Sequence, residues 1–276
     1  MAEEKVVKEV KAKKLADPVA ATIDPASQQM IEHAHSLGIE TAFDRAVTMK
    51  PCNIGTQGIC CKNCGMGPCR LPLPKGGIEG EDTRKGICGA TPNTIAARNF
   101  IRMIAGGAAA HSDHGRSVAE VFMSAARKET EAYKIKDTRK LVEVAKYLDI
   151  ETTVEIDGKT LDRDLDEIAV EVGEKALNEW GKAEGELLFA KRAPEPRYDL
   201  WKKRGVVPRN IDREIVEIMH RTHIGVDQDY KNLMKQGTRA AIADGWGGSM
   251  LATELQDILF GTPYPIASEA NLGVMK

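Results

Sequence analysis

The sequence predicts a mainly α-helical protein in which an irregular cysteine-rich loop interrupts a bundle-like domain. Aromatic residues make up only 5% of the 276 residues while 29% are charged, a balance that favours helices over sheets. Capping residues followed by proline mark two helix starts, at Asp24-Pro25 and Thr91-Pro92. Apolar residues recur at helical spacing along much of the chain. We therefore expect a flexible tail over residues 1–22 and a helical domain over residues 23–260.

Short helices precede the cysteine loop, and longer ones follow it. After a tail rich in Lys and Glu, one helix begins at Pro25 and another covers about residues 41–49. The helix after Thr91-Pro92 is apolar on more than one stripe, so we expect it to be largely buried. Gly106-Gly107 allows this helix to pack closely or to break. The remaining elements are helices from about residue 137, over 161–176, 212–220, 227–243 and 249–260, and a small hairpin over 151–159.

Histidines lie on the helix that follows Thr91-Pro92. At positions i, i+3, i+7, i+10 and i+11 the sequence has His111, His114, Val118, Val121 and Phe122. This spacing places all five on one helix face, which we expect to point inward. The pattern leaves open whether the histidines are hydrogen-bonded core residues or functional groups. His220 and His223, near the end of a later helix, are more typical of capping or surface roles than of metal ligands.

Composition excludes several classes of function. The formal net charge is −2 at pH 7, and no basic block is interleaved with aromatic residues, so nucleic acid is not an expected partner. No apolar run reaches the length of a membrane span, and the N-terminus lacks the apolar core of a secretion signal. A cytoplasmic protein is therefore expected, and clustered thiols are compatible with a reducing compartment.

All 6 cysteines of the chain fall between Cys52 and Cys88. The spacing C-x2-C-x4-C-x18-C is formed by Cys61, Cys64, Cys69 and Cys88. Three ligands on a tight loop and a distant fourth are typical of iron–sulfur ligation. A structural zinc site more often has two short pairs, and this sequence has one such pair. Zinc or a disulfide remains the alternative. The basic residues Lys62, Arg70 and Lys85 either moderate the charge of a cluster or are simply solvated.

Cys52 and Cys60 are left over, and two thiolates cannot complete a four-coordinate cluster. A second copy of the chain related by a two-fold axis would supply the missing pair, because an isologous contact presents the same patch twice. The count therefore predicts one complete cluster per chain and half of another at a dimer interface. The alternative is that these two residues are buried thiols or form an intrachain disulfide.

Several motifs resemble one known family. They are the run from Gly58 to Pro72 (Gly-Ile-Cys-Cys-Lys-Asn-Cys-Gly-Met-Gly-Pro-Cys-Arg-Leu-Pro), Lys85-Gly-Ile-Cys-Gly-Ala, Ala96-Ala-Arg-Asn-Phe and Gly106-Gly-Ala-Ala-Ala-His-Ser-Asp-His-Gly-Arg. Together they resemble the anaerobic nickel-containing carbon monoxide dehydrogenases, over essentially the whole chain after the N-terminal tail.

The resemblance implies roles for all the cysteines. The complete set matches the ligands of a [4Fe–4S] electron-relay cluster: Cys61, Cys64, Cys69 and Cys88. Cys52 and Cys60 match the ligands of a cluster shared between two subunits. Their spacing is similar to that of members whose shared cluster is [4Fe–4S], and [2Fe–2S] is the alternative. The implied partners are a second copy of the chain and a ferredoxin-like carrier, and an acetyl-CoA synthase subunit is left open.

The resemblance also implies a reaction, CO + H2O → CO2 + 2H+ + 2e−, at a nickel–iron–sulfur cluster. The family's ligands to that cluster lie downstream, and this sequence has no cysteine after Cys88. Residues 261–276 match the beginning of an α/β domain that would be truncated here. We therefore expect the N-terminal portion of a longer enzyme, inactive alone, rather than a natural short form. A hybrid-cluster-type oxidoreductase, a standalone electron-transfer module and a zinc-stabilised structural protein are the rival hypotheses.

In the family pattern His111 matches a histidine assigned to proton transfer near the catalytic cluster. His114 matches the next step of a proton route that some members continue as a histidine ladder. In this sequence the following two steps are Ser117 and Glu120, so the ladder is incomplete. Histidine suits the role because its ordinary pKa lies near neutrality. His111 is therefore the candidate acid/base.

Overall fold

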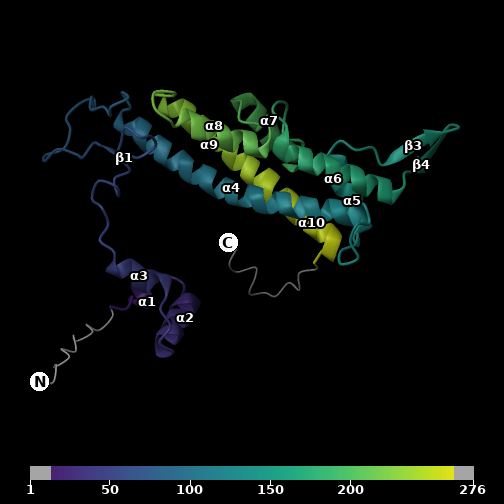
Figure 1. Cartoon of the computed structure of the whole chain (residues 1–276), viewed down its shortest axis with the longest axis horizontal. Helices are drawn as coiled ribbons and strands as arrows, with labels where there is room; N and C mark the ends of the chain where they lie inside the picture. Colours follow the sequence, from purple (N-terminus) through teal and green to yellow (C-terminus); the bar gives the residue numbers. More distant parts are fainter. Residues whose placement is uncertain (1–13, 264–276) are drawn as a thin grey trace, which may run out of the picture. The chain divides into compact units, whose positions relative to one another are not determined.

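The computed structural model describes residues 14–263 (Figure 1). The chain divides into two compact units, an N-terminal unit (Met1–Gln57) and a cluster unit (Gly58–Lys276). The structure is mainly α-helical, as predicted. The domain boundaries predicted after residues 22 and 260 stay predictions, and most of the predicted beginning of an α/β domain, from residue 264 on, lies outside the described residues. No helix within residues 14–263 is both long and apolar enough to cross a membrane.

Three helices form the N-terminal unit: α1 (Pro18–Ala21), α2 (Pro25–Ser36) and α3 (Ala42–Thr48). The helix predicted to start at Pro25 is confirmed, and the Asp24 carboxylate caps it by accepting the N–H of Ser27 at 2.8 Å. The helix predicted around residues 41–49 is also confirmed. The fully buried Asp44 accepts the N–H of Ala16 at 2.7 Å and lies 2.9 Å from His35 Nε2. The N–H of Ala16 holds the pKa of Asp44 well below its usual range, so this carboxylate remains charged and ties the unit together.

One long helix organises the cluster unit. This helix, α4 (Pro92–Ala126), has 35 residues, and Thr91 caps its N-terminus. It passes through Gly106-Gly107 without a break and extends for about 52 Å at 1.5 Å per residue. Four helices pack along it (Figure 1): α6 (Leu165–Gly181), α8 (Ile211–Arg221), α9 (Tyr230–Ile242) and α10 (Met250–Phe260).

Smaller elements complete this unit. They are the strands β1 (Cys60–Cys61), β2 (Cys69–Arg70), β3 (Thr153–Ile156) and β4 (Lys159–Asp162), the helices α5 (Thr138–Tyr147) and α7 (Glu195–Arg204), the 3-10 helix η1 (Leu188–Arg192) and the π-helix η2 (Ala243–Ser249). The predicted hairpin is confirmed, since β3 and β4 pair antiparallel. Its turn residues Asp157 and Gly158 have φ of 52° and 72°, the left-handed conformation that a tight hairpin requires. Leu161, predicted to begin a helical stripe, lies instead on β4, because this turn folds the segment back.

The main core lies between α4, α5, α6 and α10. Its fully buried side chains include Phe122, Leu141, Ile168, Trp180 and Leu255. At Gly115 the backbone of η2 approaches α4 closely. A Cβ at this position would lie 2.8 Å from the carbonyl oxygen of Gly248 and 2.9 Å from Trp180. Glycine is therefore required here for close helix packing rather than for flexibility.

The predicted inward orientation of His111 and His114 is wrong for the part of the chain that the structure describes. Val118 and Phe122 are buried as expected, but both histidines and Val121 are exposed. The buried line passes instead through Ser112 and Gly115, where η2 packs. Each of these residues is one position beyond a histidine, which corresponds to a rotation of about 100° around the helix.

Candidate metal centre

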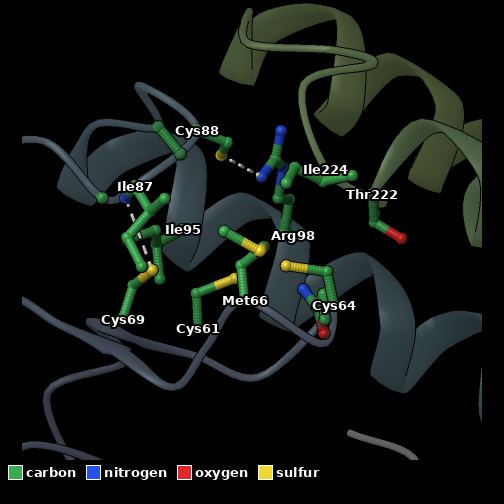
Figure 2. Close-up of a pocket in the computed structure, with 13 residues that line it drawn as sticks. Cys61, Cys64, Met66, Cys69, Ile87, Cys88, Ile95, Arg98, Thr222 and Ile224 are labelled. Carbon is green, nitrogen blue, oxygen red and sulfur yellow. Dashed lines mark hydrogen bonds between the residues drawn. The ribbon is translucent and has the colours of Figure 1, made fainter.

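Four cysteine side chains line one cavity of the cluster unit. Figure 2 shows Cys61, Cys64, Cys69 and Cys88 reaching into a common space from different segments. Ile95 and Ile224 are among the apolar residues that line this cavity. Strands β1 and β2 place Cys61 opposite Cys69 in their antiparallel pairing. The set that the spacing predicted is therefore brought together.

Hydrogen bonds from helix α4 fix the position of the cysteine loop. The side-chain amide of Asn99 donates to the carbonyls of Gly58 at 2.9 Å and Cys60 at 3.0 Å. Gly67 permits the tight turn between Cys64 and Cys69, because a Cβ on it would lie 2.9 Å from the carbonyl oxygen of Cys61. The loop is thus fastened to a rigid helix, which positions a site more precisely than a loop alone does.

Donors converge on the cysteine sulfurs. The backbone N–H of Ile87 donates to Cys69 Sγ at 3.5 Å, and Arg98 Nη1 donates to Cys88 Sγ at 3.5 Å. Gln228 Nε2 lies 3.8 Å from the same Cys88 sulfur. Burial raises the pKa of the Cys88 thiol, but the donated hydrogen bonds of Arg98, Gln228 and two backbone amides outweigh it and lower that pKa to about 7. At Cys88 the surroundings therefore favour the thiolate, the form that binds metal.

The donor set fits an iron–sulfur cluster. Within residues 14–263 no three His, Cys, Asp or Glu side chains are close enough together to hold one metal ion. In an iron–sulfur cluster each thiolate binds its own iron, whereas four thiolates of a zinc site share one ion. The cysteine sulfurs, the backbone N–H of Ile87 and the apolar walls of this cavity are typical surroundings of such clusters.

Arg98 is a functional candidate that sequence reasoning missed. It lies on the first turns of α4, is only 1% exposed and lines the cavity beside Cys88. None of the carboxylates among the described residues forms an ion pair with it, and its Nε has no hydrogen-bond partner there. A buried cation without a counter-charge is costly, so this side chain also points to an anionic group in the cavity. The sequence feature that could have identified Arg98 is a charged residue between Ile95 and Ile101 on a helix stripe that is otherwise apolar.

Cys52 and Cys60 belong to different units. Cys52 lies in the N-terminal unit and is exposed. Cys60 lies on β1 of the cluster unit, half-buried, and precedes the buried Cys61. Adjacent residues of a strand point to opposite faces, so Cys60 is directed away from the cavity that Cys61 lines. Its separation from the four-sulfur set agrees with the predicted division of the six cysteines, and the shared cluster stays a prediction.

His111 lies far from the cysteines. It is 111 − 98 = 13 positions beyond Arg98 on α4, or about 20 Å along the helix axis. Its Nδ1 lies 2.7 Å from Oδ1 of Asp244 on η2. This contact engages one ring nitrogen, so Nε2 is the atom that remains for a proton transfer. Asp244 was also missed by sequence reasoning, since 133 positions separate it from His111.

The other histidines are not part of the cysteine site. His114 lines a separate groove beside α10, together with Tyr133 and Phe260. His220 and His223, at the end of α8, are exposed. The structure therefore separates a sulfur-lined site at the start of α4 from histidines in the middle of that helix.

Comparison with known proteins gives consistent matches. The sequence model of the Prismane/CO dehydrogenase family matches residues 59–276. The chain is 50% identical to carbon monoxide dehydrogenase 1 of Methanosarcina acetivorans over 256 residues, which is 92% of this chain and 38% of that protein. It therefore spans about two fifths of the length of this relative.

Solved structures agree with this match. The fold is similar to a Ni-free carbon monoxide dehydrogenase from Thermococcus sp. AM4, with a TM-score of 0.74 and 46% identity, covering 100% of this chain and 41% of that one. It is also similar to a chain of an acetyl-CoA synthase/carbon monoxide dehydrogenase structure, in which NiZn[Fe4S4] and NiNi[Fe4S4] clusters are described in closed and open alpha subunits. The TM-score there is 0.75 and the identity 38%, covering 93% of this chain and 37% of that chain.

Proposed function

The chain belongs to the Prismane/CO dehydrogenase family, and from this premise we propose that it is the relay-cluster part of a nickel-containing carbon monoxide dehydrogenase. The whole protein would carry out CO + H2O → CO2 + 2H+ + 2e−. The observation that carries the proposal is the cavity lined by four cysteine sulfurs, in a chain 50% identical to such an enzyme. Because the chain spans 38% of that relative, CO oxidation is proposed for the longer protein only.

Cys61, Cys64, Cys69 and Cys88 would hold the relay cluster. A [4Fe–4S] cluster bound there supplies one-electron transfer. The protein's part is to hold the thiolates, exclude water and donate hydrogen bonds to sulfur. Ile95 and Ile224 provide apolar walls, and the N–H of Ile87 and the side chain of Arg98 provide the donors. These contacts support a relay role because a rigid, donor-rich shell limits the rearrangement that accompanies electron transfer.

Cys52 and Cys60 would bind the second cluster together with the same pair from another copy of the chain. Two observations support this proposal. Two thiolates per chain make four when a two-fold axis relates two chains, and Cys60 lies on the side of β1 opposite Cys61. If it is correct, replacing both residues with serine lowers the iron content of the full-length dimer by about four atoms for [4Fe–4S], or about two for [2Fe–2S]. Unchanged iron per dimer would contradict the sharing. The wild-type dimer, prepared and measured in parallel, is the reference.

Proton transfer would fall to His111. Its exposed Nε2 would accept a proton released from substrate water, while Asp244 holds Nδ1 and so the ring orientation. All six cysteines are assigned to the two relay clusters, so the nickel–iron–sulfur cluster would take its cysteine ligands from residues outside these 276. The proposed protonation site then lies in the middle of α4, and the proposed relay site lies beside the start of that helix.

One proposed partner, an electron carrier, follows from the electron balance of the reaction. Two electrons leave per CO, so the enzyme needs an external carrier of low potential, such as a ferredoxin. An acetyl-CoA synthase subunit is a further proposed partner, supported by the similarity to the acetyl-CoA synthase/carbon monoxide dehydrogenase chain. We propose that the protein lies in the cytoplasm, where a reducing environment keeps the cysteines from forming disulfides.

An assay of the full-length protein, purified without oxygen, tests the function. We expect a brown protein with visible iron–sulfur absorbance that reduces ferredoxin when CO is added and not without it. A brown protein loaded with iron and nickel but unable to reduce ferredoxin with CO would favour a hybrid-cluster-type oxidoreductase or a pure electron-transfer module. A colourless protein containing zinc would overturn the relay clusters altogether.

A further inference from the structure

We propose that Arg98 sets the reduction potential of the relay cluster by placing the one buried positive charge found among the described cavity-lining residues against Cys88. The inference rests on the proposed function, because it assumes a cluster on the four cysteines. Helix α4 then has a second role besides supporting the loop, because it carries the positive charge that stabilises the reduced state of the cluster.

The geometry places the charge at a ligand sulfur. Figure 2 shows the hydrogen bond between Arg98 and Cys88, in which Nη1 donates to Sγ at 3.5 Å. Arg98 Nη2 donates to the backbone carbonyl of Asp227 at 2.6 Å, which fixes the orientation of the guanidinium. Gln228, the next residue, donates to the carbonyl of Cys88 at 2.8 Å. The segment between α8 and α9 therefore holds both members of the pair.

The charge of Arg98 is directed to the cavity and, within residues 14–263, to no carboxylate. Asp227 is the acidic residue in contact with it, but the Asp227 side chain accepts from Arg221 at 2.9 Å and offers Arg98 only its backbone oxygen. In the cysteine loop Lys62, Arg70, Lys75 and Lys85 are exposed. The half-buried Arg84 is paired with the carboxylate of Asp82 at 2.6 Å. Solvent and salt screen exposed charges strongly, whereas a side chain that is 1% exposed is screened little. Arg98, rather than the loop residues, therefore dominates the local field.

The physical effect is on the equilibrium between two charge states. Reduction adds one electron to the cluster, and no covalent bond forms or breaks. A buried cation attracts the reduced, more negative state more strongly than the oxidised state, and a hydrogen bond to a ligand sulfur acts in the same direction. Removing the charge should therefore make the cluster harder to reduce.

The test is a redox titration of the full-length holoenzyme with dithionite, following the relay cluster by electron paramagnetic resonance. With Arg98→Gln we expect the reduction equilibrium to become about tenfold less favourable, a shift of about 59 mV to lower potential for a one-electron couple. Arg98→Lys keeps the charge and should stay within about threefold of wild type. The control is Arg116→Gln, which removes an arginine from the same helix about 27 Å away, and it should leave the potential unchanged.

Each result of the titration either supports or contradicts the proposed role of Arg98. An unshifted potential in a fully loaded Arg98→Gln protein would overturn the inference. Loss of the cluster from Arg98→Gln but not from Arg98→Lys would support it, since Lys keeps the positive charge and Gln does not. Loss from both, in proteins that remain folded by circular dichroism, would overturn it in favour of a packing role. A wild-type protein without a relay-cluster signal would overturn the proposed function itself, and the two failures are therefore distinguishable.

Discussion

Replacing Cys61 with serine in the full-length enzyme should remove the relay cluster and lower CO-dependent reduction of ferredoxin by more than about 100-fold. Even residues that only support a metal ligand cost 10–100-fold when mutated, and Cys61 is itself a proposed ligand. Its side chain is 7% exposed, so water has little access to take the place of the missing thiolate. A serine hydroxyl is a poor ligand for iron at neutral pH. The measurement is iron per chain, the relay-cluster signal and the rate of ferredoxin reduction.

Met66 offers a matched control for Cys61. It also lines the cavity, but the ligands of the proposed cluster are cysteine thiolates, and Met66 has a thioether. Met66→Leu conserves volume and removes one sulfur atom, so the iron content and the rate should be retained. If Cys61→Ser kept about four irons in the relay cluster, or if Met66→Leu lost them to the same extent, the assignment of ligands by spacing would be wrong.

Replacing His111 with alanine should lower the turnover of CO by about 100-fold or more, because a positioned acid/base typically contributes 10²–10⁴-fold. The spectra of both relay clusters should stay unchanged, since His111 lies about 20 Å along α4 from the cysteine site. Turnover and cluster spectra are measured on the same full-length preparation. The combination separates a defect in proton transfer from a defect in electron transfer.

His220→Ala is the control for this substitution. This histidine is exposed at the end of α8 and has no role in the proposed mechanism, so turnover should be unaffected. A His111→Ala enzyme with wild-type turnover would show that the His111–Asp244 contact is structural. Asp244→Asn adds an intermediate case, because the amide still contacts Nδ1 but no longer offers a negative charge to a protonated ring.

Local chemistry made much of the fold predictable. The starts of α2 and α4 were readable because a capping side chain and a proline act within one helical turn. The hairpin around Asp157-Gly158 was readable for the same reason, since its turn needs residues that accept positive φ. The cysteine set was readable because three ligands on one short loop and a fourth at a fixed distance have few chemical purposes.

Contacts between distant segments were not predictable in this way. Helical periodicity placed His111 on a face with Phe122, but it did not decide which side of that face meets η2. The close approach of Gly248 to Gly115 decides it, and this contact joins residues more than 100 positions apart. The contact between His111 and Asp244 depends on the same packing, as does the exposure of both histidines.

The helical class, the helix starts, the hairpin and the four cavity cysteines can be identified from the amino-acid sequence, because each depends on interactions within a few residues or on ligand chemistry. The buried face of α4, and the enclosure of Arg98 beside Cys88 with Asp227 turned toward Arg221, depend on contacts between distant segments. Burial is a property of the whole packing arrangement. A charged side chain acquires a special role only when the segments around it exclude water, and no local pattern reports that.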